Sequence, residues 1–346
     1  MNIFINKHHV LVLSLLLIGA VVSCNSVSRQ RREKSYAGHT MGTTFSIKLV
    51  ETGSYYESHP ALLDSIHAIL ERVNQQMSTY IDSSEISRFN DFKADQWMSV
   101  SEDFASVVHT ALRISRQSEG AFDVTVNPLV NLWGFGSGNS IRTVPLQQAI
   151  DSALTFVGYE NCRVRFNPPA LKKTVAGLQC DLGAIAKGYA VDKVSEFLER
   201  TGTENHLVEI GGEIRARGKN ENHVNWRIGI QSPDGGNRVQ KIISLENIAI
   251  ATSGDYRNYF EENGVRYSHT IDPRTGRPIQ HKLAAVTVLH DSCTVADAYA
   301  TALDVMGPED GYDLAVKENL PVLLLIKSKD GFVEKMTPEF EMYMKK

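Results

Sequence analysis

The spacing of Asp297 and Thr301 is the strongest indication in this sequence of a metal-binding site. They lie in the segment TVADAYATALDVMG at 294–307, where we expect a helix beginning near Thr294. Residues four apart on a helix project from one face. The carboxylate and the hydroxyl therefore offer hard oxygen ligands, which suit Mg²⁺ better than zinc or copper. The alternative is that both residues only cap or begin the helix.

A lysine marks a second segment, DLGAIAKGYAVD at 181–192. It reads as a helix start with Asp181 as N-cap and an apolar face at Ile185, Ala186, Tyr189 and Val194. Lys187 then stands in the first turns, where the helix dipole favours an anion. The residue is either a solvated surface lysine or the partner of something negative above the helix start.

Two further segments combine glycine with polar residues. In EIGGEI at 209–214 two glycines interrupt an apolar strand, which indicates a bulge or close approach by a ligand. In the segment 253–278, His269 precedes the stiff turn DPRTG, and an imidazole can take a proton at neutral pH. His269 is the first candidate for a general base and Asp255 the second, while a solvent-facing strand histidine is the alternative.

Several common functions are excluded. The glycines of WGFGSGN at 133–139 do not form GxGxxG, so we expect a plain loop packed down by Trp133 and Phe135. The chain has no Walker A sequence and no GxSxG elbow. Its net charge of −4 provides no global basic field, so we expect no nucleic-acid partner.

The N-terminus reads as an export signal. Lys7 and two histidines precede an apolar run from Val10 to Val22, and VVSC then places small Ser23 before Cys24. This resembles the lipobox of bacterial lipoproteins, with a signal anchor carrying an incidental cysteine as the alternative. We therefore predict a signal peptide at 1–23, a lipid on Cys24, a polar tether at 24–36, and a place in the bacterial cell envelope facing the periplasm or exterior.

The remaining chain, 37–346, predicts one α+β domain. Alternation or apolar runs predict strands at 43–50, 206–210, 226–231 and 321–328, and two paired strands, KIISLE and IAIAT, within 241–252. Helical spacing predicts helices within 59–80, at 101–118 and at 309–318. Helices at both ends of a run of antiparallel strands favour α+β over a βαβ rhythm. Each remaining cysteine is expected to be a buried free thiol.

Taken in order, seven segments resemble the ApbE family of FAD:protein FMN transferases. They are HTMGTTFSI, MSTYIDSSEISRFN, GAFDVTVNPLV, DLGAIAKGYAVD, LVEIGGEI, SGDYRNYF…HTIDPRTG and ADAYATALDVMG, and they cover most of the chain after residue 39. The resemblance implies the ApbE-like α+β fold, antiparallel-rich sheets flanked by helices, and an exported enzyme that uses FAD and Mg²⁺.

The resemblance also implies a set of site residues. FAD contacts are implied at Met41, Tyr80, Ala121, Phe122, Asp123, Asp181, Lys187 and Ile271. Metal ligands are implied at the carbonyl of Ala184 and the side chains of Asp297 and Thr301. Without the resemblance, Tyr80 would be a core tyrosine and Asp181 a helix cap.

The implied reaction moves FMN from FAD to a threonine hydroxyl of an acceptor flavoprotein and releases AMP. By family, the expected acceptor is a subunit of a membrane redox pump such as the sodium-pumping NADH:quinone reductase or its relatives, or another secreted flavoprotein. The alternatives are an FAD pyrophosphatase that releases FMN and AMP, a non-catalytic FAD-binding lipoprotein, and a structural envelope lipoprotein. A flavin store would not need the Asp297 and Thr301 pair.

Overall fold

An eight-stranded sheet forms the frame of the computed structural model, which describes residues 31–52, 61–137, 142–234, 236, 238–254 and 258–344. Every neighbouring pair of strands in this sheet is antiparallel. In spatial order its strands are β1 (Arg31–Thr40), β2 (Thr43–Thr52), β6 (His206–Ile210), β7 (Glu213–Arg217), β10 (Ile248–Gly254), β15 (Leu283–His290), β16 (Val322–Ser328) and β17 (Gly331–Met336). The predicted strands that fall in this sheet are confirmed.

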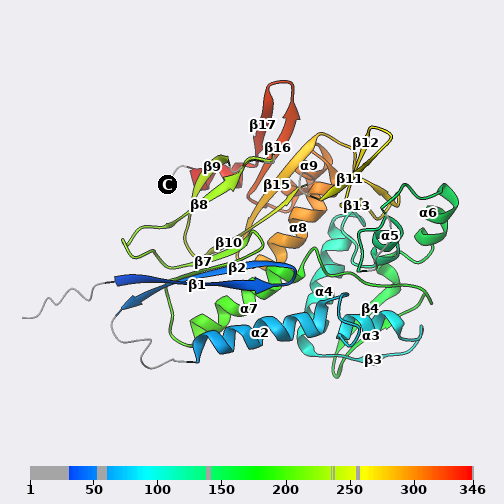
Figure 1. The fold of residues 1–346 in the computed structure, drawn as a ribbon, viewed down its shortest axis with the longest axis horizontal. Coiled ribbons are helices and arrows are strands. Elements are labelled where there is room, and N and C mark those ends of the chain that lie inside the picture. Colours follow the sequence, from blue (N-terminus) through cyan, green and yellow to red (C-terminus); the bar gives the residue numbers. More distant parts are fainter. Residues whose placement is uncertain are drawn as a thin grey trace, which may run out of the picture.

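Helices and four small sheets surround this frame (Figure 1). The helices are α2 (Leu62–Met77), α3 (Glu85–Asp91), α4 (Glu102–Gln117), α5 (Asn127–Leu132), α6 (Gln147–Leu154), the 3₁₀ turn η2 (Tyr159–Asn161), α7 (Ala186–Arg200), α8 (Cys293–Met306), α9 (Asp310–Lys317) and α10 (Pro338–Met344). The small sheets consist of β3 (Met98–Ser99), β4 (Cys162–Phe166) and β5 (Pro169–Lys173); β8 (Trp226–Gln231) and β9 (Val239–Leu245); β11 (Tyr259–Glu262) and β12 (Val265–Ser268); and β13 (Ile271–Asp272) and β14 (Arg277–Pro278). The helices predicted from apolar spacing are confirmed.

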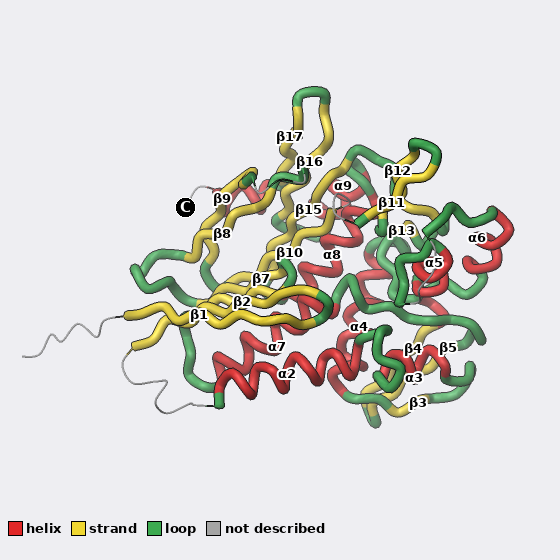
Figure 2. Tube along the Cα trace, viewed as in Figure 1, coloured by secondary structure: helices red, strands yellow, loops and turns green. Residues whose placement is uncertain are grey.

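The central sheet is covered on both faces at β16, which explains the unbroken apolar run at the start of this strand. Leu324 belongs to the large core beneath the helices, whereas Leu323 and Leu325 belong to a second core on the opposite face. Successive strand residues point to opposite faces, so a strand covered on both sides must be apolar throughout. Figure 2 shows α2 and α7 on the helix side, and α7 packs on β6 and β7.

Helices α7 and α8 pack against each other in unusually close contact. An ideal Cβ placed on Gly188 would lie 2.3 Å from the carbonyl oxygen of Cys293 and 2.8 Å from Cβ of Asp297. Only glycine fits this crossing, because any side chain would drive the two helices apart. The glycine inside α7 therefore sets the distance between the two helices that carry Lys187 and Asp297.

Two local predictions need correction. The predicted start of α7 at Asp181 is wrong, because the helix begins at Ala186 and Asp181 accepts a hydrogen bond from the Gly183 N–H at 2.7 Å instead. Gly211 and Gly212 form no bulge. With φ of +65° and +108°, they make the two-residue turn between β6 and β7, a conformation that suits glycine.

The N-terminal predictions have mixed outcomes. The signal peptide, Cys24 and tether residues 24–30 lie outside the described residues. The assignment of 31–36 to the tether is wrong, because these residues form the first part of β1 and pair with β2. No helix in the described ranges is long and apolar enough to cross a membrane.

The three cysteines of the described chain agree with prediction. Cys162, Cys180 and Cys293 are buried and free. The loop after α5 also agrees where it is described, since Trp133 is fully buried and its indole N–H donates to the Gly276 carbonyl at 2.8 Å.

Buried His206 predicts a pH-dependent stability. Its Nδ1 lies 2.9 Å from the Thr203 carbonyl and its Nε2 lies 2.8 Å from the Ser195 hydroxyl, and burial lowers its pKa to about 4. Between pH 6.5 and 4 the unfolded chain, whose histidine has an ordinary pKa near 6.5, binds more protons than the folded chain. The free energy of unfolding therefore decreases as the pH is lowered from 6.5 to 4. Between pH 7.5 and 4.5 this decrease amounts to about 2.5 kcal/mol, and we expect His206→Gln to remove it. Urea unfolding of both proteins at pH 7.5 and 4.5 measures it, and equal pH dependence in both would contradict the assignment.

Candidate functional site

A cavity of about 430 Å³ lies where the starts of α7, β7 and β13 meet the middle of α8. Ten of the residues singled out from the sequence line it: Ala121, Phe122, Asp123, Asp181, Ala184, Lys187, His269, Ile271, Asp297 and Thr301. The segment that carries Lys187 and the one that carries Asp297 are thus brought together although 109 residues separate Gly188 from Asp297. The convergence expected between these two segments is present.

Two of the predicted residues that the structure describes do not line this cavity. Met41 lies at the turn between β1 and β2 with φ of 50°, and Tyr80 is 72% exposed between α2 and α3. Tyr80 is therefore not the core tyrosine considered as an alternative. Asp255 lies outside the described residues. The flavin contacts implied for Met41 and Tyr80 stay predictions.

Lys187 occupies the centre of the site. Its Nζ lies 2.6 Å from Oε1 of Glu213 and 3.9 Å from Oδ1 of Asp297. Lys187 is thus not a solvated surface lysine, and the negative charge expected above the helix start comes first from two carboxylates of the chain itself. Sequence reasoning missed Glu213. The available signal was a charged residue directly after a glycine pair and at the start of a strand.

Burial and charge together set the ionisation of this cluster. Burial alone would lower the pKa of Lys187, but the carboxylates of Asp297 and Glu213 outweigh burial and raise it. Burial raises the pKa of Asp297, and it raises the pKa of Glu213 to about 7 despite the neighbouring ammonium. Two buried carboxylates share one cation, so the cavity favours a ligand that brings positive charge or hydrogen-bond donors.

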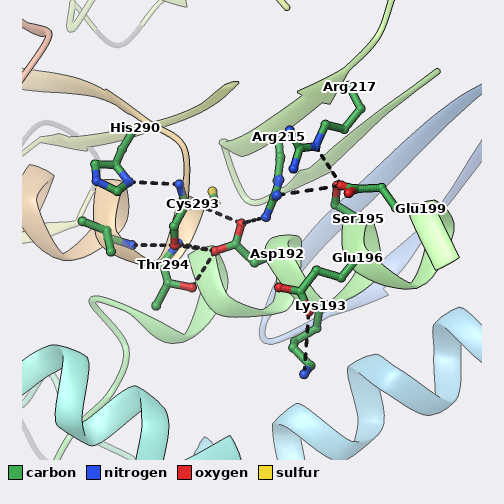
Figure 3. Close-up of polar contacts among 12 residues, drawn as sticks. Asp192, Lys193, Ser195, Glu196, Glu199, Arg215, Arg217, His290, Cys293 and Thr294 are labelled. Atoms are coloured by element: carbon green, nitrogen blue, oxygen red, sulfur yellow. Dashed lines mark hydrogen bonds and ion pairs between the residues drawn. The ribbon is translucent and has the colours of Figure 1, made fainter. Parts of the chain in front are cut away.

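The two helices hold each other through reciprocal hydrogen bonds. Oδ2 of Asp297 on α8 accepts the N–H of Gly188 in the first turn of α7 at 3.0 Å. In return, Asp192 on α7 accepts the N–H groups of Cys293 and Thr294 at the start of α8, each at 2.9 Å (Figure 3). Each carboxylate satisfies N–H groups that a helix start leaves without partners.

A buried arginine completes the network around Asp192. Arg215 of β7 donates from Nη1 to Oδ1 of Asp192 at 2.6 Å, and the Thr294 hydroxyl donates to Oδ2 at 2.7 Å (Figure 3). The Ser292 hydroxyl also donates to Oδ2 at 2.7 Å. One carboxylate therefore ties α7, β7 and the start of α8 together. Because α8 carries Asp297 and Thr301, this network positions both residues in the cavity.

His269 meets the requirements of a proton acceptor at the cavity wall. Its Nδ1 lies 3.0 Å from the Asn258 carbonyl, which can only accept, so Nδ1 carries the proton of that bond. In a neutral imidazole Nε2 is then the basic nitrogen. The Phe135 ring packs edge-on against the imidazole with centroids 6.4 Å apart, which helps to hold its orientation.

Asp123 lines the cavity but uses its carboxylate inside the protein. Oδ1 accepts the N–H and the hydroxyl of Thr125, both at 2.7 Å, and Oδ2 accepts the Tyr159 N–H at 2.8 Å. Burial raises the pKa of Asp123 to about 6, while these three hydrogen bonds act against the shift. Its main contribution in the structure is to hold the segment after α4 against η2.

The implied magnesium ligands fit a hard cation by their chemistry. A carbonyl, a carboxylate and a hydroxyl, from Ala184, Asp297 and Thr301, line one cavity, and all are oxygen donors. In the described part of the chain no three His, Cys, Asp or Glu side chains group to hold a metal. The implied set has one carboxylate and is of a different kind, as expected for an ion that also takes ligand and water oxygens.

The fold and the cavity define an α+β protein with a polar ligand site at the start of one helix and the middle of another. The model of the ApbE family matches residues 41–324, and the chain belongs to this family. The prediction of the family and of its fold is thereby confirmed.

Close relatives carry one name. The chain is 45% identical to the FAD:protein FMN transferase of Vibrio cholerae over 96% of its own length and 99% of the relative's, and 40% identical to that of Haemophilus influenzae over 96% and 97%. The solved flavin transferase ApbE of Vibrio cholerae superposes with a TM-score of 0.84 at 44% identity, covering 90% of this chain and 99% of that one. An apo flavinyl transferase ApbE of Pseudomonas stutzeri gives 0.84 at 38%, covering 91% and 97%.

The Asp192 network predicts a large loss of stability on its removal. Asp192→Asn removes the negative charge beside buried Arg215 and places an amide N–H₂ donor against the donors at the start of α8. We expect the free energy of unfolding to decrease by about 3 kcal/mol. Glu199→Gln is the matched control, because Glu199 lies on the same helix and contacts Arg215 at 3.8 Å but is partly exposed. It should cost less than about 1 kcal/mol. Denaturant unfolding compares them, and equal losses would count against the network.

Proposed function

We propose that this protein transfers FMN from FAD to a threonine hydroxyl of an acceptor protein and releases AMP, with Mg²⁺ required. One observation carries the proposal: Lys187, the three oxygen donors and His269 converge on one cavity. The names of the relatives support the transfer of FMN from FAD to a protein. The threonine, the metal and the AMP leaving group come from the family resemblance.

The residues can be given roles that balance the reaction. The threonine oxygen forms a bond to the phosphorus of the FMN half, and the bridging P–O bond to the AMP half breaks. His269 takes the hydroxyl proton at Nε2, which increases the nucleophilicity of the oxygen. Lys187 faces the charge that develops on the departing phosphate, and electrostatic stabilisation of this kind is usually the largest contribution to phosphoryl transfer.

Ala184, Asp297 and Thr301 would hold the magnesium ion through their oxygens. When bound, the ion neutralises phosphate charge and polarises the phosphoryl group. The N–H of Gly188 fixes one oxygen of Asp297, which leaves Oδ1 toward the cavity and Lys187.

Removal of Asp297 tests the metal assignment. Asp297→Ala should abolish Mg²⁺-dependent formation of the fluorescent flavin adduct. It also removes the acceptor of the Gly188 N–H, which should lower the free energy of unfolding by about 1–3 kcal/mol, so circular dichroism must show that the variant is folded under assay conditions. Asp313→Ala, which removes an exposed carboxylate from neighbouring α9, is the matched control and should keep full activity. Unchanged activity of the Asp297 variant would refute the assignment.

Removal of His269 tests the proton acceptor. His269→Ala should slow adduct formation by about 10²- to 10⁴-fold, while the dissociation constant for FAD changes little. His223→Ala, at an exposed position outside the cavity, controls for loss of a histidine. Equal loss of FAD binding and transfer would make His269 a binding residue.

The alternative activity differs only in the nucleophile. If water attacks in place of threonine, the products are FMN and AMP, and the protein is an FAD pyrophosphatase. Incubation with FAD, Mg²⁺ and an acceptor carrying a target threonine separates the two, because only transfer labels the acceptor. Steady AMP release without any adduct would favour hydrolysis, and no turnover at all would favour a flavin-binding lipoprotein.

We further propose that the protein acts in the bacterial cell envelope, anchored through a lipid on Cys24. The apolar run and the small residue before Cys24 support this. An acceptor in a membrane redox complex, such as a subunit of the sodium-pumping NADH:quinone reductase, is consistent with that location. Radiolabelled palmitate incorporation into the intact chain, lost in Cys24→Ala, would test the anchor.

A further inference from the structure

Glu213 has one oxygen that the protein itself does not use. Its carboxylate is 3% exposed, and Oε1 lies 2.6 Å from Nζ of Lys187. Oε2 is buried and has no hydrogen-bond partner among the residues that the structure describes. The residue lines the same cavity as Asp297 and His269. A buried carboxylate oxygen without a partner is costly, so such an atom points to a donor that arrives with a ligand.

A second buried carboxylate, that of Asp192, provides a comparison, because it contributes to the structure and does not line the cavity. Arg215 lies two residues after Glu213 on β7, and both side chains face α7, where they pair with Asp192 and Lys187. Both oxygens of Asp192 accept hydrogen bonds from the protein. The two ion pairs are built alike, but only the one in the cavity leaves an acceptor open.

We propose that Oε2 of Glu213 accepts a hydrogen bond from a hydroxyl group of a bound ligand. The inference rests on the proposed function, which supplies two hydroxyl sources: the sugar alcohols of FAD and the acceptor threonine. The carboxylate thereby becomes a substrate-binding residue in addition to holding Lys187. Either source offers an O–H donor, which the anionic phosphates do not.

The backbone around Glu213 is rigid enough to aim this oxygen. Gly211 and Gly212 form the tight turn that precedes Glu213, and an ideal Cβ on Gly211 would lie 3.3 Å from Cδ of Lys187 and 2.9 Å from Cγ2 of Thr43. The turn thus presses against the lysine side chain and against the β1–β2 hairpin. Burial of the Glu213 side chain and its ion pair with Lys187 hold the carboxylate in place before a ligand arrives, which lowers the entropic cost of binding.

A double-mutant cycle separates direct contact from support of Lys187. The dissociation constant for FAD is measured by flavin fluorescence for the intact chain, Glu213→Gln, Lys187→Met and the double variant. Glutamine keeps the shape of the glutamate side chain and one oxygen that can accept from Lys187, but its NH₂ group, a donor, can replace Oε2. Glu209→Gln is the matched control, since Glu209 supports the same turn by accepting the Gly212 N–H at 2.8 Å and does not line the cavity.

We expect Glu213→Gln to weaken FAD binding by about 10- to 100-fold, and by a similar factor in the Lys187→Met background. This result assigns the hydroxyl to FAD. Unchanged FAD binding with a raised KM for the acceptor protein, absent in Glu209→Gln, assigns it to threonine and equally supports the proposal.

Two results would overturn the contact. In the first, the effect of Glu213→Gln disappears in the Lys187→Met background, so that the carboxylate only positions the lysine. In the second, Glu213→Gln behaves like Glu209→Gln in both FAD and acceptor binding. An intact chain that binds no FAD would overturn the proposed function together with this contact, so the two failures are distinguishable.

Discussion

The ion pair between Arg215 and Asp192 is the interaction on which the rest of the structure depends. Removing two charges from water is expensive, and the attraction between them repays this cost only when the remaining donors and acceptors are satisfied. The Asp192 side of the pair meets this condition, because both of its oxygens accept hydrogen bonds from the start of α8 as well as one from the arginine, whereas Nε of Arg215 is buried and has no hydrogen-bond partner among the described residues. Strand β7, helix α7 and helix α8 are thereby locked in one arrangement.

The chemistry of the cavity follows from that arrangement. With α8 fixed at its start, Asp297 reaches the first turn of α7 one helical turn later and accepts the Gly188 N–H. The missing side chain at Gly188 allows this approach. The same geometry brings Lys187 close to two carboxyl groups, so a small buried volume contains one ammonium and two carboxyl groups whose hydrogen-bonding needs a polar ligand can complete.

Strand β7 carries one residue of the structural network and one residue of the cavity. On β7, Arg215 pairs with Asp192, both of whose oxygens accept hydrogen bonds. Glu213, two residues earlier, pairs with Lys187 through Oε1, and its Oε2 has no partner among the described residues. Because alternate strand residues face the same side, one register places both on α7. The candidate ligand cavity is therefore positioned by the same strand that carries the structural network.

The sequence by itself determined the elements and most of the cavity residues. Apolar periodicity identified the main strands and helices, because the spacing of apolar residues follows the face that each element buries. The seven ordered motifs identified the family and, with His269 as the predicted proton acceptor, ten residues that line one cavity. Only the tertiary structure decided the roles of Glu213 and Asp192, the start of α7 at Ala186, the internal use of the Asp123 carboxylate and the exposure of Tyr80. These features depend on partners far away in the chain, and local sequence carries no record of which distant group will satisfy a buried charge.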